Sequence, residues 1–143
     1  MELNEALVRK IVERTLAELS GDQMVKHVDP SGIMSIKTST VKCEPFAGAK
    51  GVGLKDATTL GEAPRMGAGV MELDHGELEW TLTYDEYDYV IEGTLQLEID
   101  GRIIEGGPGD ILYIPANSHI HFKTPDFTRY AYFVYPANWS ELV

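Results

Sequence analysis

The chain has 143 residues, of which 43% are hydrophobic, so it is long enough for one domain with a buried core. Its formal net charge of −11 argues against binding to the phosphate backbone of a nucleic acid. No apolar run approaches the roughly 20 residues of a membrane span, and no secretory signal is expected. No membrane partner is therefore expected. A single cysteine forms no internal disulfide, so we expect a reducing compartment, the cytoplasm.

Residues 4–19 are predicted to form an amphipathic helix within a first segment, 1–20. Its apolar residues recur at helical spacing: Leu7, Val8, Ile11, Val12, Thr15, Leu16 and Leu19. Asn4 can cap the first turn, because its side-chain oxygen can accept a bond from an unpaired backbone amide. A helix of this length is marginal alone in water, so its apolar face needs a surface. That surface is either this protein's own β domain, a second copy, or a docking partner.

Residues 21–32 are polar and end in Asp29-Pro30-Ser31-Gly32, which predicts a linker that closes in a turn. From residue 33 to 143 the hydrophobic pattern alternates with a period of two. Asp100-Gly101 predicts a type I′ hairpin, because both central positions of that turn need positive φ. Short strands with turns between them and no second helix predict an all-β sandwich or barrel. We expect strands at 33–37, 40–44, 66–72, 77–83, 95–99, 102–105, 111–114 and 128–135.

The stretch WTLTYDEYDYVIEG at 80–93 resembles the first sequence motif of cupin barrels. Glu86 and Gly93 stand at the cupin spacing. Trp80 and Leu82 occupy the positions where cupins carry two metal-binding histidines. The resemblance implies a double-stranded β-helix barrel, an RmlC-like jelly roll, in which most of the metal site is missing. No tightly bound metal of the cupin type is therefore expected.

The stretch GDILYIPANSHIH at 109–121 resembles the second cupin motif, with Ile120 at its histidine position. If Ile120 faces inward, His119 and His121 face outward. A bulge or a one-residue slip after Asn117 would reverse this and turn both histidines inward. Two inward histidines together with Glu86 would rebuild a three-ligand metal site, so the strand register after Pro115 decides between the two readings.

Glu86 is the main candidate for chemistry, because a carboxylate in an apolar cavity has a raised pKa and suits a general acid or base. The alternative is a vestigial carboxylate that hydrogen-bonds Tyr84. Asp88 shares the face of Glu86 along the strand. Two carboxylates this close could hold a hard cation such as Mg²⁺ that carries a nucleotide. Tyr84, Glu86 and Asp88 are therefore the predicted catalytic residues.

The chain from about residue 29 to 139 resembles the ethanolamine-utilisation protein Q (EutQ) family. The segments that carry the resemblance are VKCEPF at 41–46, VGLKD at 52–56, WTLTYDEYDYVIEGTL at 80–95, GDILYIP at 109–115, SHIHF at 118–122 and PANW at 136–139. Many members have a larger N-terminal region than this chain. The resemblance implies a protein of bacterial microcompartments that degrade ethanolamine, with acetate kinase activity (ATP + acetate to acetyl phosphate + ADP).

Under this interpretation, Mg-ATP is a substrate, and Arg65, His121 and Lys123 are the predicted residues for binding it. The alternative is a non-catalytic cupin scaffold that links shell and cargo. In that case the helix at 4–19 docks onto a shell or cargo protein of the microcompartment. A metal-dependent cupin enzyme with a rearranged site is a third alternative. A homodimer is expected in each case, through an aromatic outer face at Tyr130, Tyr132 and Phe133.

Overall fold

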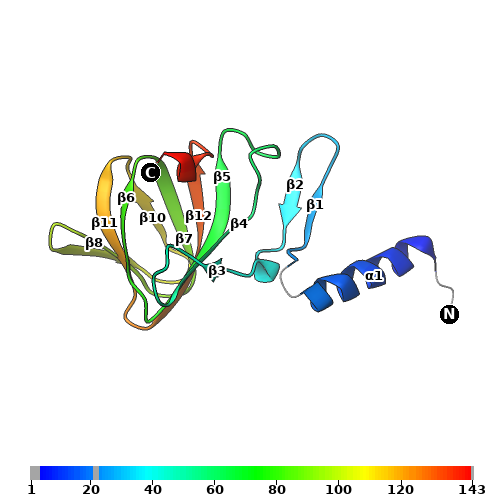
Figure 1. Ribbon diagram of the computed structural model, residues 1–143, viewed down its shortest axis with the longest axis horizontal. Helices are drawn as coiled ribbons and strands as arrows, with labels where there is room; N and C mark the ends of the chain where they lie inside the picture. Colours follow the sequence, from blue (N-terminus) through cyan, green and yellow to red (C-terminus); the bar gives the residue numbers. More distant parts are fainter. Residues whose placement is uncertain (1–3, 21–22, 143) are drawn as a thin grey trace. The chain divides into compact units, whose positions relative to one another are not determined.

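The computed structural model describes residues 4–20 and 23–142 of the chain. The chain divides into two compact units, Met1–Lys42 and Cys43–Val143. The first contains helix α1 (Glu5–Ser20), and the second contains a barrel built from two β-sheets (Figure 1). We expected the β domain to begin at residue 33. Residues 33–42 fall in the first unit, where strand β2 (Met34–Ile36) pairs with β1 (Lys26–Val28).

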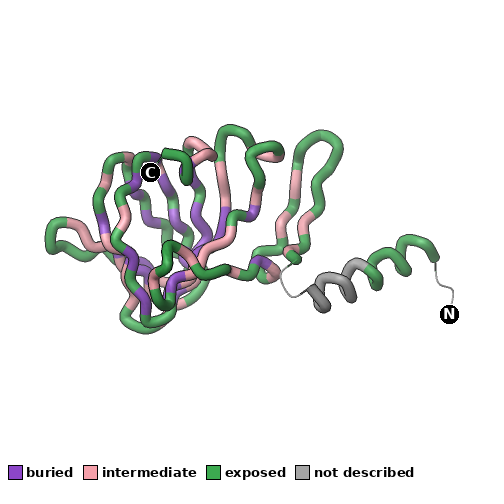
Figure 2. The backbone as a smooth tube through the Cα atoms, viewed as in Figure 1, coloured by how far each residue is buried: buried purple, intermediate pink, exposed green. Residues whose placement is uncertain are grey.

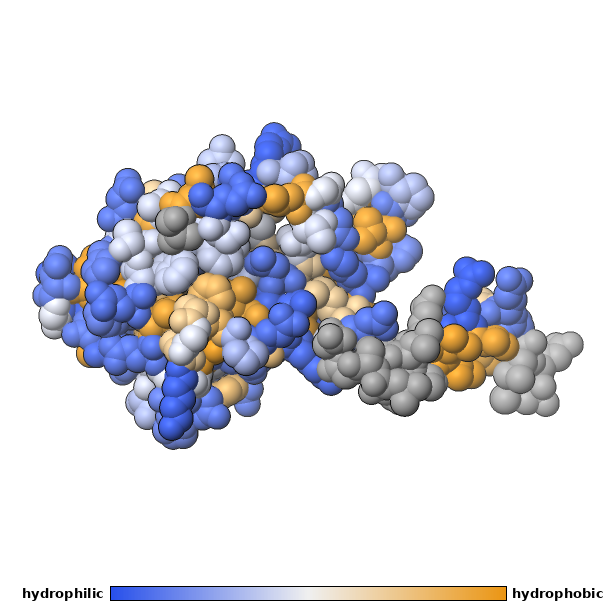
Figure 3. All heavy atoms as spheres, in the orientation of Figure 1, coloured by the Kyte–Doolittle hydropathy of each residue, from blue (hydrophilic) through white to orange (hydrophobic). Residues whose placement is uncertain are grey.

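Helix α1 begins as the sequence predicts. The backbone N–H of Leu7 donates a hydrogen bond to Oδ1 of Asn4 at 2.8 Å, which caps the first turn. Four apolar side chains at helical spacing are 37–52% exposed: Leu7, Val8, Ile11 and Val12. Figure 3 shows apolar surface along this helix. Within the described residues, no helix is long and apolar enough to cross a membrane.

A small hairpin follows, with one strand in the expected linker, 21–32, and the other within the strand expected at 33–37. Strand β1 (Lys26–Val28) pairs antiparallel with β2 (Met34–Ile36) across the predicted turn. The turn is closed by a bond from the N–H of Gly32 to the carbonyl of Asp29 at 2.9 Å. The strand expected at 40–44 is wrong except at Glu44: η1 (Thr38–Thr40) forms a 3₁₀ turn, and β3 (Glu44–Pro45) begins only at Glu44. The hydroxyl of Thr40 donates to the carbonyl of Lys37 at 2.7 Å, and such local bonding competes with a strand ladder.

The second unit is a two-sheet barrel in which every strand pairing is antiparallel. The first sheet has the order β10-β7-β12-β5-β4-β3, and the second has the order β6-β11-β8-β9. This confirms the all-β jelly roll preceded by one short helix. The elements are β3 (Glu44–Pro45), β4 (Val52–Asp56), β5 (Gly67–Asp74), β6 (Leu78–Leu82), β7 (Asp85–Gly93), β8 (Leu95–Ile99), β9 (Arg102–Gly106), β10 (Ile111–Ile114), β11 (Ser118–Lys123), β12 (Phe127–Tyr135) and η2 (Trp139–Glu141).

The core draws buried residues from both sheets of the barrel. Figure 2 shows these buried positions in purple along the barrel strands. Along β7 the burial alternates, so that Glu86, Asp88 and Val90 face inward while Tyr87 and Tyr89 face outward. This is the alternation that the sequence predicts. The buried residues of this core include Leu73, Leu82, Val90, Leu95, Ile120 and Tyr130.

Two turns account for features of the sequence: Gly93 of the first cupin motif and the hairpin predicted at Asp100-Gly101. Gly93 has a φ of 71°, and a Cβ there would lie 1.8 Å from the carbonyl oxygen of Phe127. No side chain fits at this position, so the glycine of the first motif is required by close backbone approach. Asp100 and Gly101 have φ values of 49° and 76°, as a type I′ turn requires.

The aromatic outer face that we expected is wrong for two of its three residues. Tyr130 and Tyr132 are 0% and 2% exposed and belong to the core, whereas Phe133 is 42% exposed. The reason is strand alternation: residues 130 and 132 share one face of β12, and residue 133 lies on the other. The outer face carries a different aromatic row, in which Tyr87 pairs with Tyr113 of β10 on one side and with Phe133 on the other.

Candidate functional site

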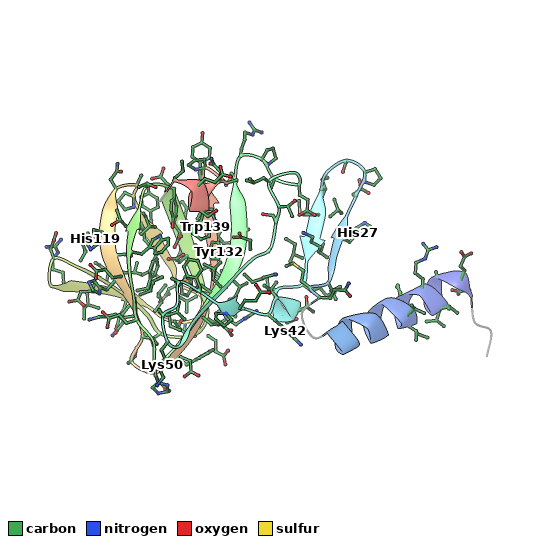
Figure 4. The ribbon with its side chains drawn as sticks, viewed as in Figure 1. His27, Lys42, Lys50, His119, Tyr132 and Trp139 are labelled. Atoms are coloured by element: carbon green, nitrogen blue, oxygen red, sulfur yellow. The ribbon has the colours of Figure 1, made fainter. Side chains whose placement is uncertain are left out.

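A pocket opens at the end of the barrel where η2 meets the two sheets. It contains about 290 Å³ of space, including the part open to solvent. Trp139 of η2 is its centre, with ring centroids 5.7 Å from Tyr84 and 6.4 Å from Tyr132. Figure 4 shows Tyr132 and Trp139 next to each other at this end of the barrel. Most lining residues are aromatic or aliphatic: Phe46, Leu54, Met71, Leu78, Trp80, Tyr84, Glu86, Phe122, Tyr132 and Trp139.

Hydrogen bonds hold the aromatic rings in place. Oδ1 of Asp56 accepts from the hydroxyl of Tyr132 at 2.5 Å and from the indole N–H of Trp139 at 3.3 Å. The indole N–H of Trp80 donates to the hydroxyl of Tyr84 at 2.9 Å. Gly69 leaves the space for this arrangement, because a Cβ there would lie 2.1 Å from the hydroxyl oxygen of Tyr132. The rings are therefore fixed before any ligand arrives.

Glu86 and Asp88 lie at the inner end of the pocket and in the barrel interior behind it. Glu86 is 6% exposed and lines the pocket, while Asp88 is 0% exposed. Neither carboxyl oxygen of Asp88 has a hydrogen-bond partner within the part of the chain that the structure describes. Buried polar groups in proteins are nearly always bonded, so an orphaned carboxyl needs an explanation such as a proton, an ion or a ligand.

Burial raises the pKa of Glu86 to about 7. Burial also raises the pKa of Asp88 well above its ordinary value, and the negative charge of Glu86 raises it further. The pKa of the Tyr84 hydroxyl is raised by burial first and then by the charge of Glu86. At pH 7 the Glu86 carboxyl is therefore protonated in about half of the molecules, whereas ordinary glutamates have already lost their protons.

The positions of the cupin metal ligands are filled by apolar side chains. Trp80 and Leu82 face inward from β6, and Ile120 faces inward from β11 directly opposite Trp80. Among the described residues, no group of three or more His, Cys, Asp or Glu side chains is arranged to hold a metal ion. Since Ile120 is buried and its neighbours are not, the reading with outward histidines is confirmed, and the slipped register is excluded.

His119 and His121 lie on the outer face of the four-stranded sheet. Figure 4 labels His119 on this side of the barrel. Nε2 of His119 is 2.8 Å from a carboxylate oxygen of Glu79, and Nδ1 of His121 is 2.7 Å from one of Glu77. Lys123 lies on the same face and pairs with Glu98.

Of the six predicted site residues, three lie together inside the barrel and three lie outside it. It brings Tyr84, Glu86 and Asp88 together inside the barrel. It places His121 and Lys123 outside the barrel, because β11 alternates and its inward positions belong to Ile120 and Phe122. Arg65 is exposed in the loop before β5, where its carbonyl accepts a bond from the N–H of Ala137 at 3.0 Å.

Sequence reasoning did not assign Phe46, Tyr132 and Trp139 to the pocket, nor Asp56, whose carboxylate bonds the last two. Three of them stand in segments that carry the family resemblance, namely VKCEPF, VGLKD and PANW. These segments lie far apart in the sequence and converge on one pocket. The signal in the sequence that could have identified them is that these segments carry the family resemblance.

The chain matches the family described as "Ethanolamine utilisation protein EutQ" over residues 1–141. It is 42% identical over 145 residues to the acetate kinase EutQ of Clostridioides difficile, covering 96% of this chain and 92% of that protein. It is 35% identical over 151 residues to the acetate kinase EutQ of Salmonella typhimurium, covering 99% of this chain and 66% of that longer protein.

Solved structures agree with the sequence comparison. The structure of the EutQ protein of Clostridium difficile has a TM-score of 0.79 and 44% identity, covering 84% of this chain and 92% of that chain. Ethanolamine utilization protein Q of Salmonella typhimurium has a TM-score of 0.77 and 37% identity, covering 81% and 96%. A cupin superfamily protein of Desulfitobacterium hafniense, 14% identical with a TM-score of 0.55 and coverage of 69% and 86%, is similar in fold alone. The chain therefore belongs to the EutQ family of ethanolamine utilisation proteins.

Proposed function

We propose that this chain is an acetate kinase of ethanolamine utilisation, which transfers the terminal phosphoryl group of ATP to acetate and forms acetyl phosphate and ADP. The observation that carries the proposal is the 42% identity with a protein named acetate kinase EutQ, across 96% of this chain. That relative is nearly the same length, so the matched part is almost the whole of it.

The pocket at the barrel end is where we propose that the transfer takes place. Phosphoryl transfer depends mainly on positioning and on stabilising charge. The lining residues of the described chain include no Lys or Arg, so the positive charge must come from the Mg²⁺ of the nucleotide. Glu86, with Asp88 behind it, offers the carboxylate oxygens that Mg²⁺ prefers.

The character of the lining suggests where each substrate lies. The aromatic rings suit the methyl group of acetate, and the nucleotide lies outside the rings with its Mg²⁺ toward Glu86. The hydroxyl of Tyr84 accepts the indole bond from Trp80 and keeps its own proton for donation to a substrate oxygen.

Glu86→Gln tests this proposal. The change keeps the shape of the side chain and removes its charge, so the loss of the metal-holding carboxylate should lower kcat for acetyl phosphate formation by at least about 100-fold. Acetyl phosphate is trapped as the hydroxamate, with Mg-ATP and acetate saturating. The matched control is Glu79→Gln, since the Glu79 side chain is 59% exposed on the barrel exterior. Full activity in folded Glu86→Gln protein would remove the pocket from the reaction.

A second candidate function is a connector in a microcompartment, and the exposed apolar residues of α1 favour it. Leu7, Val8, Ile11 and Val12 are 37–52% exposed along one face of the helix. We propose that this face docks onto a shell or cargo protein of a cytoplasmic microcompartment. The two functions are compatible, because the pocket lies within the second unit and the helix lies within the first.

A further inference from the structure

The pocket at the barrel end is closed to anything larger than about one water molecule. Its aromatic rings pack against one another, and the ring centroid of Trp139 lies 5.7 Å from that of Tyr84 and 6.0 Å from that of Phe46. Trp139 and Glu86 are each 6% exposed. If the proposed function takes place in this pocket, one of its walls must therefore move before a substrate reaches Glu86.

Most walls of the pocket belong to strands that are hydrogen-bonded to their neighbours. Leu54, Met71 and Tyr132 lie on β4, β5 and β12, which are consecutive strands of the larger sheet. Moving any of them would break a ladder of backbone hydrogen bonds. Trp139 is different, because it stands in η2 after the last strand, and no strand pairing of the described chain includes residues 136–142.

Two other lining residues lie outside the strands, but both are tied to their neighbours. The backbone of Phe46 donates to the carbonyl of Val52 at 3.0 Å and accepts from the N–H of Ala49 at 3.2 Å, which closes a tight turn. The hydroxyl of Tyr84 accepts the indole bond of Trp80 at 2.9 Å, and β7 begins at the next residue. The wall that moves with the least loss of hydrogen bonds is therefore the one after β12.

Residues 138–142 bend back on themselves and form a small unit. The N–H groups of Glu141 and Leu142 donate to the carbonyls of Asn138 and Trp139 at 2.9 and 3.1 Å. The side-chain amide of Asn138 also donates to the carboxylate of Glu141 at 3.3 Å. These bonds lie within the segment, so residues 138–142 can move together without breaking them.

Among the described residues, two hydrogen bonds join this segment to the barrel. The indole N–H of Trp139 donates to Oδ1 of Asp56 at 3.3 Å, and the hydroxyl of Thr83 donates to the carbonyl of Leu142 at 2.5 Å. When Trp139 leaves, Asp56 keeps the bond from Tyr132, and the indole N–H meets water. No buried polar group is then left unpaired, which would otherwise oppose the movement.

We propose that residues 138–142 form a lid and that its opening carries Trp139 out of the pocket, which admits acetate to Glu86. The hinge lies between Ala137 and Trp139, because the N–H of Ala137 bonds to the carbonyl of Arg65 at 3.0 Å and holds Ala137 on the barrel. The choice of acetate rests on the proposed function, whereas the movement does not. In the closed state the indole occupies the place that a substrate needs, so the lid and acetate compete.

Quenching of tryptophan fluorescence by acrylamide measures the opening without any substrate. The chain has two tryptophans, so Trp80→Phe leaves Trp139 as the only one. In this background Thr83→Val removes the hydroxyl bond to the lid and keeps the shape of the side chain. Losing one hydrogen bond should raise the quenching constant of Trp139 about two- to tenfold. Thr81→Val is the matched control and should leave the constant unchanged, because the Thr81 hydroxyl is bonded to His119 on the barrel exterior.

Kinetics connect the lid to the reaction. In protein that retains both tryptophans, Thr83→Val should lower KM for acetate by the same factor and leave kcat for acetyl phosphate formation unchanged, since only open molecules bind acetate. Thr83→Ser keeps the hydroxyl and should restore both parent values. If NMR spectra show that Thr83→Val does not fold, a chain that ends at Glu141 removes the same bond from the other side.

Equal quenching of Trp139 in folded Thr83→Val and Thr81→Val protein would overturn the lid. A raised quenching constant with an unchanged KM for acetate would also overturn the proposal, because the lid would then not control access to the pocket. If neither the parent protein nor any variant forms acetyl phosphate, the proposed function fails. The quenching comparison decides in that case whether residues 138–142 open.

Discussion

Glu86 and Asp88 lie two positions apart on the inner face of β7, where burial opposes the ionisation of both. Exposed carboxyl groups at the barrel surface pair with cations, as Glu98 does with Lys123. The interior pair has no such partner among the described residues. This difference makes the interior pair responsive to pH near neutrality, which exposed carboxylates are not.

We expect the free energy of unfolding to fall as pH rises from about 4.5 to about 7. The pKa of Glu86 is about 7 in the folded protein and 4.5 for an ordinary glutamate. Between these values the folded state binds more protons than the unfolded state, so stability is fully present below 4.5 and is lost as pH rises through 7. The full difference corresponds to roughly 3 kcal/mol. Urea unfolding at a series of pH values measures it.

The variant Glu86→Gln tests whether Glu86 causes this pH dependence of the free energy of unfolding. The variant should lose much of the pH dependence in this window and keep the part that belongs to Asp88, whose pKa is also raised. Glu79→Gln, on the barrel exterior, should retain the parent profile. An identical profile for Glu86→Gln and the parent would mean that the pH dependence comes from other groups.

At this scale the sequence predicted some positions well and others not at all. Glu86 was identifiable because a motif fixes its position, and Asp88 followed from strand alternation. Phe46, Asp56 and Trp139 come from three separate segments, and only the folded barrel brings them to Tyr132. The register of β11 could not be decided from sequence, since one slipped residue exchanges Ile120 for the histidines. Pairing with β6 decided it.

At the scale of the elements, the outer face of strands β10, β7 and β12 exposes two rows of aromatic and aliphatic side chains. Tyr113, Tyr87 and Phe133 form a row across these strands, and they are 50%, 54% and 42% exposed. Ile111 and Tyr89 form the adjacent row, at 67% and 44%. Contiguous exposed apolar residues of this extent mark interaction surfaces. A protein with a net charge of −11 repels its own copies elsewhere, so this uncharged face is where two copies can meet.

We propose that this face is a homodimer interface, and Tyr87→Asp should disrupt it. A charge at the centre of the row leaves an unpaired carboxylate in the contact, which we expect to shift the protein to monomers in analytical ultracentrifugation. Ile103→Asp is the control, because Ile103 is 54% exposed on β9 of the other sheet. The proposal fails if folded Tyr87→Asp protein keeps the parent's mass, or if the parent protein is itself monomeric.

Among the elements, alternating segments were predictable, and the short strands were predicted only in part. Strands β8, β10 and β12 lie where the pattern placed them, and β2 lies within the strand expected at 33–37. Strand β1 has three residues and forms only because a turn brings β2 beside it. Such a strand leaves no periodic trace in the sequence. For this reason residues 21–32, which contain β1, were predicted to be a linker.

At the scale of the whole molecule, the two units have different sources of stability. The barrel contains a continuous core drawn from both of its sheets. Helix α1 has 16 residues, and its described apolar side chains are substantially exposed. Isolated helices of this length are marginal in water. The barrel should therefore fold without the helix, while the helix gains from whatever surface covers its apolar face.

This difference leads to a prediction for the double variant Val8→Asp and Ile11→Asp. Two charges on the apolar face of α1 should abolish its docking, because each carboxylate would be buried without a partner. Co-sedimentation with microcompartment shell proteins, expressed together with the chain, measures the docking. We expect it to be lost, with the melting temperature of the barrel unchanged.

The control variant Glu5→Gln and Arg9→Gln changes a pair that lies beside the apolar face. These side chains are 91% and 70% exposed and are joined by an ion pair at 3.6 Å, which is worth only a few tenths of a kcal/mol. It should co-sediment like the parent protein. Undiminished co-sedimentation of the aspartate variant would exclude the apolar face as a connector. A lower melting temperature of the barrel in that variant would instead show that the helix covers part of this protein itself.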